Sequence, residues 1–396
     1  MDNTKFRSWV FSRQGLAAPK FTSARKALAG AGWQRSVAGI NPYMAIRARS
    51  GEGRAEVDAL AADLQLFELP CARSCTYVLP ADHFALGLAA ARNFSAVTEI
   101  ASARKLGVAD SEIATLKSAV VKALSGGALS PADMKPVLGD KVRNLGDEGK
   151  KRGLTTTLPL ALSLLQTEGY IRRKPVNGRF DVQRYTYELW SPPLTDLPSD
   201  EETANRLAAI YFAWMGAATL KEFREFTLFP AKLAKSACDA SGLKPFDESG
   251  DLLATPESIA EYADHSVSKE PRYRVISSMD SYLLQRRGSQ FWLADEDRTQ
   301  NAPTERGLKS VGDLTELTAH AIIDRGRLVG IWEFDQAAGK VEWHAWIEPN
   351  DALNAEIAAL ERYIIDELGD ARSFSLDSPA SRQPKIEAIR ALNIKT

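Results

Sequence analysis

The amino-acid sequence predicts an α+β fold in which units of helices followed by a short β-hairpin recur along the chain and a β-rich region ends it. Two observations lead to this prediction. Residues 149–187 combine a helical apolar stripe with two strand-like runs, and residues 54–80 repeat that order of elements. From about Asp280 the chain changes to successive strand-like runs, among them HAIIDRGRLVGIWEF and KVEWHAWIEP.

The first unit is predicted to begin with helices and to end in a hairpin. Residues 3–17 and 22–31 have helical patterns, and Pro42 opens the run PYMAIRARS, where a proline suits the first turn of a helix. A further helix at 54–63 precedes LQLFELPCARSCTYVLP, which indicates two short strands joined around residues 72–74.

The second unit follows a mostly helical stretch and centres on residues 149–187. Pro159 suits the first turn of its helix, Gly169 ends the helix, and the dipeptide Asn177-Gly178 favours a type I′ hairpin turn between the two strands. The segment holds eight basic and two acidic residues. A helix backed by a cationic hairpin is the arrangement of a winged helix, which places a helix in a DNA groove while the wing binds phosphates. A solvated helix-hairpin on an ordinary α+β protein is the alternative interpretation.

A proline- and acid-rich segment at 191–202 predicts a linker before the third unit, which is helical over 203–240. In the C-terminal region, residues 325–327 and 338–340 suit hairpin turns, and a helix at 351–368 is expected to pack back on the sheet. We therefore predict four domains, with the boundaries 1–125, 126–197, 198–277 and 278–396.

The distribution of charge favours a polyanionic partner even though the formal net charge is −1. Residues 1–54 carry 10 basic and 2 acidic residues, and residues 149–187 add a second basic block. Two basic blocks on an acidic body produce a polarised field that steers a polyanion to one face. The alternative is that folding disperses these charges.

The composition excludes several classes of protein and site. No apolar run approaches the length of a membrane span, and three cysteines form no disulfide framework, which favours a reducing cytoplasm. The four histidines lie far apart, and Cys71 and Cys75 lack the second pair that a structural zinc site requires. Phosphate-binding glycine loops and GxSxG elbows are absent as well, so we expect no metal and no cofactor.

Several motifs together resemble the AlkZ/YcaQ-like winged-helix family. The segments that carry the resemblance are PYMAIRAR (42–49), LPCARSCTYVLPADHFAL (69–86), the helix-hairpin 155–189, AAIYFAWMGAATLKEFREFT (208–227), SMDSYLLQRR (278–287) and RGRLVGIWEF (325–334). The resemblance implies three tandem winged-helix units followed by a C-terminal β-rich, barrel-like domain. It also implies DNA glycosylase activity, because the family includes enzymes that excise alkylated bases and unhook interstrand crosslinks.

That activity suits a site without a metal or a covalent nucleophile. A base alkylated on a ring nitrogen is already cationic, so the enzyme has only to place a water and stabilise positive charge on the sugar. The family uses a Gln-apolar-Gln or Gln-apolar-Asp motif, and the aligned triplet here is Gly39-Ile40-Asn41. Asn41 could orient the water, whereas Gly39 offers no side chain, and Gln34 and Arg35 lie upstream. Asn41 as a helix N-cap and Gln34 as a surface residue are the alternatives.

The resulting hypothesis is a DNA glycosylase with Asn41 and Gln34 as catalytic candidates, acting as a monomer on damaged double-stranded DNA in the cytoplasm, near the nucleoid. The predicted DNA-binding residues are Lys20, Arg35, Arg47, Arg49, Arg73, Lys150, Lys151, Arg152, Arg172, Arg173, Lys174, Arg179 and Arg184. Arg179 is expected at the tip of the wing, in a minor groove. Asp280 is expected to fix a turn or to pair with Arg286 or Arg287. A catalytically silent DNA-binding regulator or damage sensor is the second hypothesis, and a protein-binding function is the third.

Overall fold

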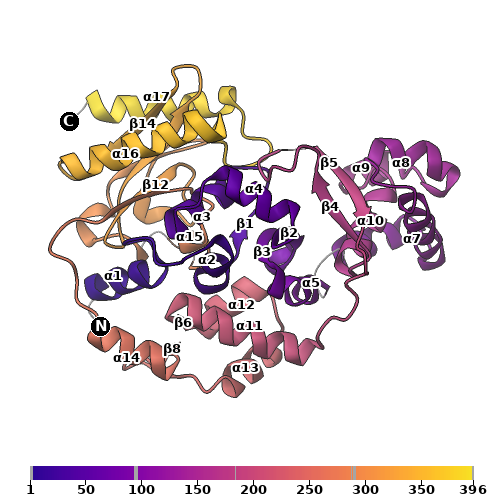
Figure 1. The fold of residues 1–396 in the computed structure, drawn as a ribbon, viewed down its shortest axis with the longest axis horizontal. Coiled ribbons are helices and arrows are strands. Elements are labelled where there is room, and N and C mark those ends of the chain that lie inside the picture. The colour runs from indigo at the N-terminus through magenta and orange to yellow at the C-terminus, as the bar shows by residue number, and fades with distance from the viewer. Residues whose placement is uncertain (1–2, 93–96, 183, 287, 289–290, 395–396) are drawn as a thin grey trace.

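The computed structural model describes residues 3–394 except 93–96, 183, 287, 289 and 290, and it confirms the α+β class (Figure 1). Helical units and short antiparallel sheets alternate along the chain, and a four-stranded sheet lies near its C-terminal end. Within the described residues, none of the helices has the length and apolar character that crossing a bilayer requires.

The first unit places three short strands against three helices. Its elements are α2 (Ala24–Ala31), β1 (Gln34–Arg35), α3 (Asn41–Ser50), α4 (Arg54–Ala62), β2 (Leu66–Pro70) and β3 (Thr76–Pro80). The antiparallel sheet has the order β1-β3-β2, with Gln34 opposite Val78 and Leu66 opposite Pro80. The unit is preceded by α1 (Asn3–Arg13) and followed by α5 (Phe84–Arg92).

The second unit lies at one side of the molecule (Figure 1). The helices α6 (Val97–Lys105) and α7 (Asp110–Leu124) lead into it, and its own elements are α8 (Pro131–Leu138), α9 (Gly146–Lys151), α10 (Leu158–Thr167), β4 (Ile171–Pro175) and β5 (Tyr185–Leu189). The predicted helix and both strands are therefore present. Leu129 adds a bridge to Tyr187, so a third extended segment lies beside the hairpin.

The connection between β4 and β5 differs from the prediction of a two-residue hairpin turn. The paired strands end at Pro175 and Tyr185, so nine residues separate them and Asn177-Gly178 cannot close the hairpin. Gly178 still makes a local turn with φ +78°. The loop is long because it folds back on the first unit, where Phe180 is fully buried and its N–H donates to the Tyr43 hydroxyl at 3.0 Å.

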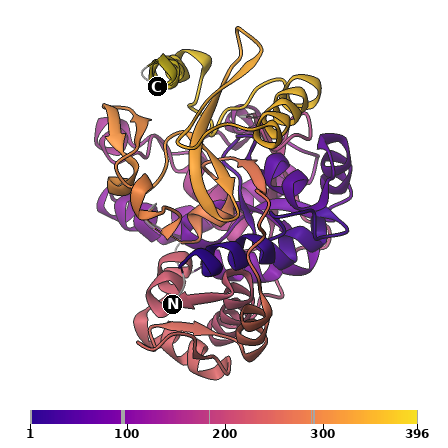
Figure 2. The same ribbon diagram turned by 90° about the vertical axis from the view of Figure 1, so that its left-hand side faces the viewer.

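The third unit repeats the element order of the first and lies at one end of the molecule in Figure 2. Its elements are α11 (Asp200–Met215), β6 (Ala217–Thr219), α12 (Leu220–Thr227), α13 (Ala231–Ala240), β7 (Lys244–Pro245) and β8 (Leu252–Ala254), followed by α14 (Pro256–Asp264). The sheet order is β6-β8-β7, which matches the β1-β3-β2 order of the first unit.

The C-terminal region is built on one open sheet. Its elements are β9 (Tyr273–Ile276), α15 (Ser281–Leu284), β10 (Asn301–Thr304), β11 (Gly307–Ser310), β12 (His320–Asp324), β13 (Arg327–Asp335), β14 (Lys340–Ala345), α16 (Asp351–Tyr363), a π-helical turn (Ile364–Leu368) and α17 (Pro379–Ile394). The four-stranded order β14-β13-β12-β9 leaves β14 and β9 as edges, so the described strands do not close and the barrel-like prediction is not confirmed. The predicted turns and the helix at 351–368 are present.

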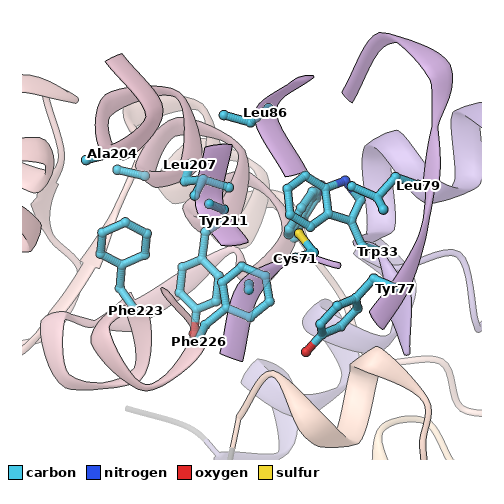
Figure 3. Close-up of a cluster of buried hydrophobic side chains, with 14 of the residues drawn as sticks. Trp33, Cys71, Tyr77, Leu79, Leu86, Ala204, Leu207, Tyr211, Phe223 and Phe226 are labelled. Carbon is cyan, nitrogen blue, oxygen red and sulfur yellow. The ribbon is translucent and has the colours of Figure 1, made fainter. Parts of the chain in front are cut away.

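The first and third units and the C-terminal region share hydrophobic cores, whereas most of the core of the second unit is its own. In Figure 3 side chains of the first unit and α5 face side chains of the third unit, in one cluster that includes Trp33, Cys71, Tyr77, Leu79, Leu86, Ala204, Leu207, Tyr211, Phe223 and Phe226. A second cluster joins α1 to the C-terminal sheet through Phe6 and Trp9. These shared cores fix the units relative to one another.

Candidate functional site

The loop between β1 and α3, residues 36–40, carries the aligned triplet of the family motif. Asn41 begins α3 and is fully buried. Its Nδ2 donates to the Arg35 carbonyl at 2.9 Å, whereas its Oδ1 is buried and has no hydrogen-bond partner among the described residues. Ile40 occupies the N-cap position and no side chain caps the helix, so the N-cap interpretation of Asn41 is wrong.

Gly39 faces a C-terminal segment, residues 369–378, which we call the strap. The N–H of Ile40 donates to the Arg372 carbonyl at 3.0 Å. A Cβ atom at position 39 would lie 2.1 Å from the carbonyl oxygen of Ser373. Since atoms this close overlap, any side chain at position 39 requires the strap to move. The glycine at this position is therefore required by the close approach of the strap.

Gln34 is buried rather than exposed, and it binds α15 instead of the loop. Its Nε2 donates to the Ser281 hydroxyl at 2.5 Å and to the Gly32 carbonyl at 3.2 Å, and its Oε1 accepts from the Ser281 N–H at 3.1 Å. Both ends of the amide are thus engaged. Gln34 links the first unit to the C-terminal region, and its amide is not free to orient a water beside Asn41.

Glu68 in β2 is a buried acid that the sequence analysis did not single out. One carboxylate oxygen accepts from the Ser36 hydroxyl at 2.8 Å, and the other pairs with the guanidinium of Arg173 at 3.1 Å. Burial raises the pKa of Glu68, although Arg173 opposes the rise. Its only sequence signal is a lone acid in the apolar run LQLFELP. Glu68 fixes the loop and the second unit's hairpin to each other.

Three of the predicted DNA-binding arginines are internal links. Arg49 has a side chain only 1% exposed and forms a bidentate pair with Asp280, at 2.6 and 2.9 Å, so the prediction that it binds phosphate is wrong. Asp280 was expected to fix a turn or to pair with Arg286 or Arg287. It caps α15 and its partner is Arg49 rather than Arg286, and Arg287 lies outside the described residues. Arg73 donates to the Leu284 carbonyl at 3.1 Å. The guanidinium of Arg47 lies 4.0 Å from the ring centroid of Tyr363 and also pairs with a glutamate.

The hairpin arginines also have partners within the protein. Arg172 pairs with Glu188 at 2.7 Å and lies over the Trp190 ring, while Arg173 lies over the Tyr185 ring at 4.0 Å. Arg179 is not at an exposed tip: it pairs with Asp181 and donates to the Leu368 carbonyl at 2.8 Å. These contacts contradict insertion of Arg179 into a minor groove, because its Nε and Nη2 are already bonded within the protein.

The exposed members of the predicted set lie on different elements: Lys20, Lys150, Lys151, Arg152, Lys174 and Arg184. Lys150 and Lys151 form i,i+3 ion pairs on α9, and Arg35 is half-buried beside the loop. Arg184 lines a cavity of about 330 Å³ together with Arg372 of the strap, next to the long β4–β5 connection. The structure therefore brings Arg184 and Arg372 together there, whereas α9 lies on the far side of the second unit's hairpin in Figure 1.

A scan against protein-family models matches residues 32–363 to the family described as DNA glycosylase AlkZ-like. This range includes the loop, the first unit from β1 onwards, and the second and third units. The chain belongs to the AlkZ-like DNA glycosylase family. The AlkZ-like match ends before the strap, so the segment that closes the position of Gly39 lies outside the matched residues.

The fold of this AlkZ-like chain is also similar to a solved structure, Streptomyces sahachiroi DNA glycosylase AlkZ. The TM-score is 0.66 at 20% sequence identity, and the alignment covers 94% of this chain and 98% of that one. A search of curated protein sequences finds no match. Membership thus rests on the family model, and the structural similarity supports the fold.

Proposed function

We propose that this AlkZ-like chain hydrolyses the N-glycosidic bond of alkylated bases in double-stranded DNA, including crosslinked bases, as a monomer in the cytoplasm. The observation that carries the proposal is the unpaired Oδ1 of Asn41, within the segment that the family model matches. A buried amide oxygen without a partner is costly, and a water that donates to it would satisfy it. That water is the nucleophile that would bond to the anomeric carbon of the sugar as the N-glycosidic bond breaks and the cationic, alkylated base leaves as a neutral base.

The element order supports three winged helices as the DNA-binding scaffold. The first and third units both have the order helix, strand, helix, helix, strand, strand, with the central position of each sheet taken by the last strand. In the second unit Leu129 stands in the place of the first strand. We propose the domain boundaries 1–125, 126–197, 198–277 and 278–396, with α6 and α7 as a helical extension of the first domain. Strand β9 lies within 198–277 and joins the C-terminal sheet through its pairing with β12.

The proposed contact with DNA runs along the second unit's hairpin and the strap. Lys174 and Arg184 are exposed there, and Arg372 lies beside Arg184. Because these side chains meet phosphates rather than base edges, binding should depend strongly on salt and little on sequence. Since Asn41 is fully buried, catalysis also requires the loop and the strap to separate when a base enters.

Single-turnover release of the base from DNA alkylated at guanine N7 tests the proposal. Asn41→Ala should lower the rate about 10²- to 10³-fold, the loss typical of one oriented polar group, with little change in DNA affinity. Asn354→Ala, on the exposed face of α16, is the matched control and should leave the rate unchanged. Equal rates for Asn41→Ala and the unsubstituted protein would refute the catalytic role of Asn41.

Gly39 favours a second candidate, a catalytically silent protein that binds DNA as a regulator or damage sensor. The strap leaves no space for a side chain at this position, and Gln34 is engaged by Ser281. The first glutamine of the family motif therefore has no counterpart here. Binding to alkylated duplex DNA without any release of the base would establish this second function.

A further inference from the structure

A cavity of about 690 Å³ lies between the start of α1 and the C-terminal sheet. Its walls come from the first turns of α1, from residues 291–298 and from the ends of β9, β12 and β13. None of its lining residues belongs to the predicted DNA-binding set or to the loop at 36–40. The cavity is therefore separate from the site proposed above, and its volume is typical of a small-molecule site.

Arg7 of α1 lines this cavity without a carboxylate partner among the described residues. Its side chain is nine-tenths buried, with 8% of the residue exposed, and its Nη1 donates to the Leu293 carbonyl at 2.6 Å. Each of the other three arginines of the cavity forms an ion pair: Arg298 with Asp295 at 3.1 Å, Arg325 with Asp324 at 2.8 Å and Arg327 with Asp297 at 2.6 Å.

The environment of Arg7 favours an anion. Burial lowers the pKa of Arg7, and the nearby carboxylates of Asp297 and Glu296 offset this only in part. A guanidinium presents a planar fork of donors that fits a carboxylate or a phosphate in a bidentate manner. With one nitrogen used by Leu293, the other donors of the fork remain for a ligand.

The N-terminus of α1 opens on the same cavity. Asn3 and Thr4, the first residues of this 11-residue helix, line it, and the first turn contains no acidic residue. The helix dipole places a partial positive charge at this end. The helix terminus and the guanidinium of Arg7 thus act on one volume, and both favour negative charge.

The remaining walls decide which kind of anion fits. Tyr273, Phe291 and Val329 supply apolar surface, whereas Asp295 and Glu296 line the cavity as well and repel a second negative charge. We propose that this cavity binds a small organic anion, whose single carboxylate or phosphate group pairs with Arg7 and whose flat apolar body lies against the aromatic and aliphatic walls. A DNA strand carries many negative charges, which the carboxylates of Asp295 and Glu296 would repel.

Calorimetric titration of the full chain with four probes tests the site. Benzoate and phenyl phosphate carry the anion and an apolar ring, benzamide has the ring without the charge, and inorganic phosphate has the charge without the ring. We expect benzoate or phenyl phosphate to bind at least about tenfold more tightly than benzamide and than inorganic phosphate. If benzoate binds more tightly than phenyl phosphate, the ligand of this site carries a carboxylate, and the reverse order indicates a phosphate.

Variants connect the binding to these residues. Arg7→Met should weaken the tighter probe about 10- to 100-fold, because it removes charge-assisted hydrogen bonds. Asn3→Asp places a carboxylate at the exposed helix terminus without a change of shape and should weaken binding about two- to fivefold even if Arg7→Met fails to fold. Arg298→Met, on the rim and already paired with Asp295, is the control and should change affinity less than twofold, the small effect of an exposed pair.

Three results would overturn the proposal. They are equal affinity for benzoate and benzamide, affinity unchanged in both Arg7→Met and Asn3→Asp, and displacement of the bound probe by a duplex oligonucleotide. None of these measurements depends on release of a base from DNA. The failure of this inference is therefore distinguishable from failure of the proposed glycosylase activity.

Discussion

Removal of one charge from the buried Arg49–Asp280 pair should destabilise the whole molecule. Both side chains are 1% exposed, and the two hydrogen bonds between them join α3 of the first unit to the start of α15. In Asp280→Asn the amide oxygen can still cap the helix by accepting from the Tyr282 N–H, as the Oδ1 of Asp280 does at 2.8 Å. The substitution therefore isolates the loss of charge, which leaves Arg49 buried and unpaired.

Loss of one partner of a buried ion pair costs about 3–5 kcal/mol of unfolding free energy, since the remaining charge is no longer compensated. We expect a loss of that size for Asp280→Asn. Asp280→Ala should lose about 1 kcal/mol more, because it also removes the helix cap. The double variant Arg49→Met, Asp280→Asn should recover most of the loss, because no charge is left without a partner.

Urea unfolding followed by tryptophan fluorescence measures these differences, and the chain provides eight tryptophans. Asp239→Asn is the matched control, since Asp239 forms an exposed i,i+4 pair with Lys235 and its loss should have little effect. A stability of Asp280→Asn within about 0.5 kcal/mol of the unsubstituted protein would show that the pair is not a structural link. A double variant less stable than Asp280→Asn would contradict the charge argument.

Three further predictions concern the strap, the hairpin and the buried ionisable groups. Gly39→Gln should lower stability by about 1–3 kcal/mol in a thermal melt, since its side chain collides with the strap. Lys174→Ala with Arg184→Ala should reduce the salt dependence of DNA affinity by about two units of slope, one for each lost phosphate contact. Burial lowers the pKa of His320 to about 3 and raises that of Glu333 to about 7. The contribution of His320 to the stability of the protein is therefore lost as the pH falls below 6.5, whereas that of Glu333 is lost as the pH rises towards 7. Between pH 7 and 5 the acid-induced loss of stability should be shallower in His320→Asn and steeper in Glu333→Gln.

Each of these has a control or a contrary outcome. Gly126→Gln is the control and should be tolerated, because a Cβ there meets no atom closer than 3.7 Å. Equal melting temperatures of Gly39→Gln and Gly126→Gln would mean that the strap moves aside without a loss of stability. Lys235→Ala, on the exposed face of α13, should leave the salt slope unchanged. Parallel pH profiles in the His320 and Glu333 variants would show that neither group titrates as its burial implies.

Local sequence signals predicted the elements well, because they act within a few residues. Pro159 stands in the first turn of α10 and Gly169 follows its end with φ +76°, as expected. The dipeptide Asn177-Gly178 does turn the chain, yet it does not close the hairpin. A tertiary contact causes this departure from the predicted turn. Phe180 is buried against Tyr43, 137 residues earlier, and no local pattern specifies that partner.

The site was less predictable for the same reason. Gln34 was a catalytic candidate and Arg49 a predicted DNA-binding residue, but their partners, Ser281 and Asp280, lie 247 and 231 residues later in the chain. Counting charges in the sequence cannot show which of them neutralise one another after folding. The start of a helix near Pro42 was correctly predicted, whereas the strap that adjoins it is brought there by the C-terminal region.

The packing of α1 on the C-terminal sheet has a consequence for synthesis of the protein. Arg7 bonds to Leu293, 286 residues later, and Phe6 and Trp9 share a cluster with Trp292 and Ile331. A ribosome that adds about 5–20 residues per second needs roughly 15–60 s between making α1 and making its partners. Until Phe246 and Tyr262 and then the C-terminal sheet have been made, the aromatic face of the first helix lacks the side chains that cover it. Nascent chains should therefore depend on a holding chaperone, and slower translation should increase their aggregation.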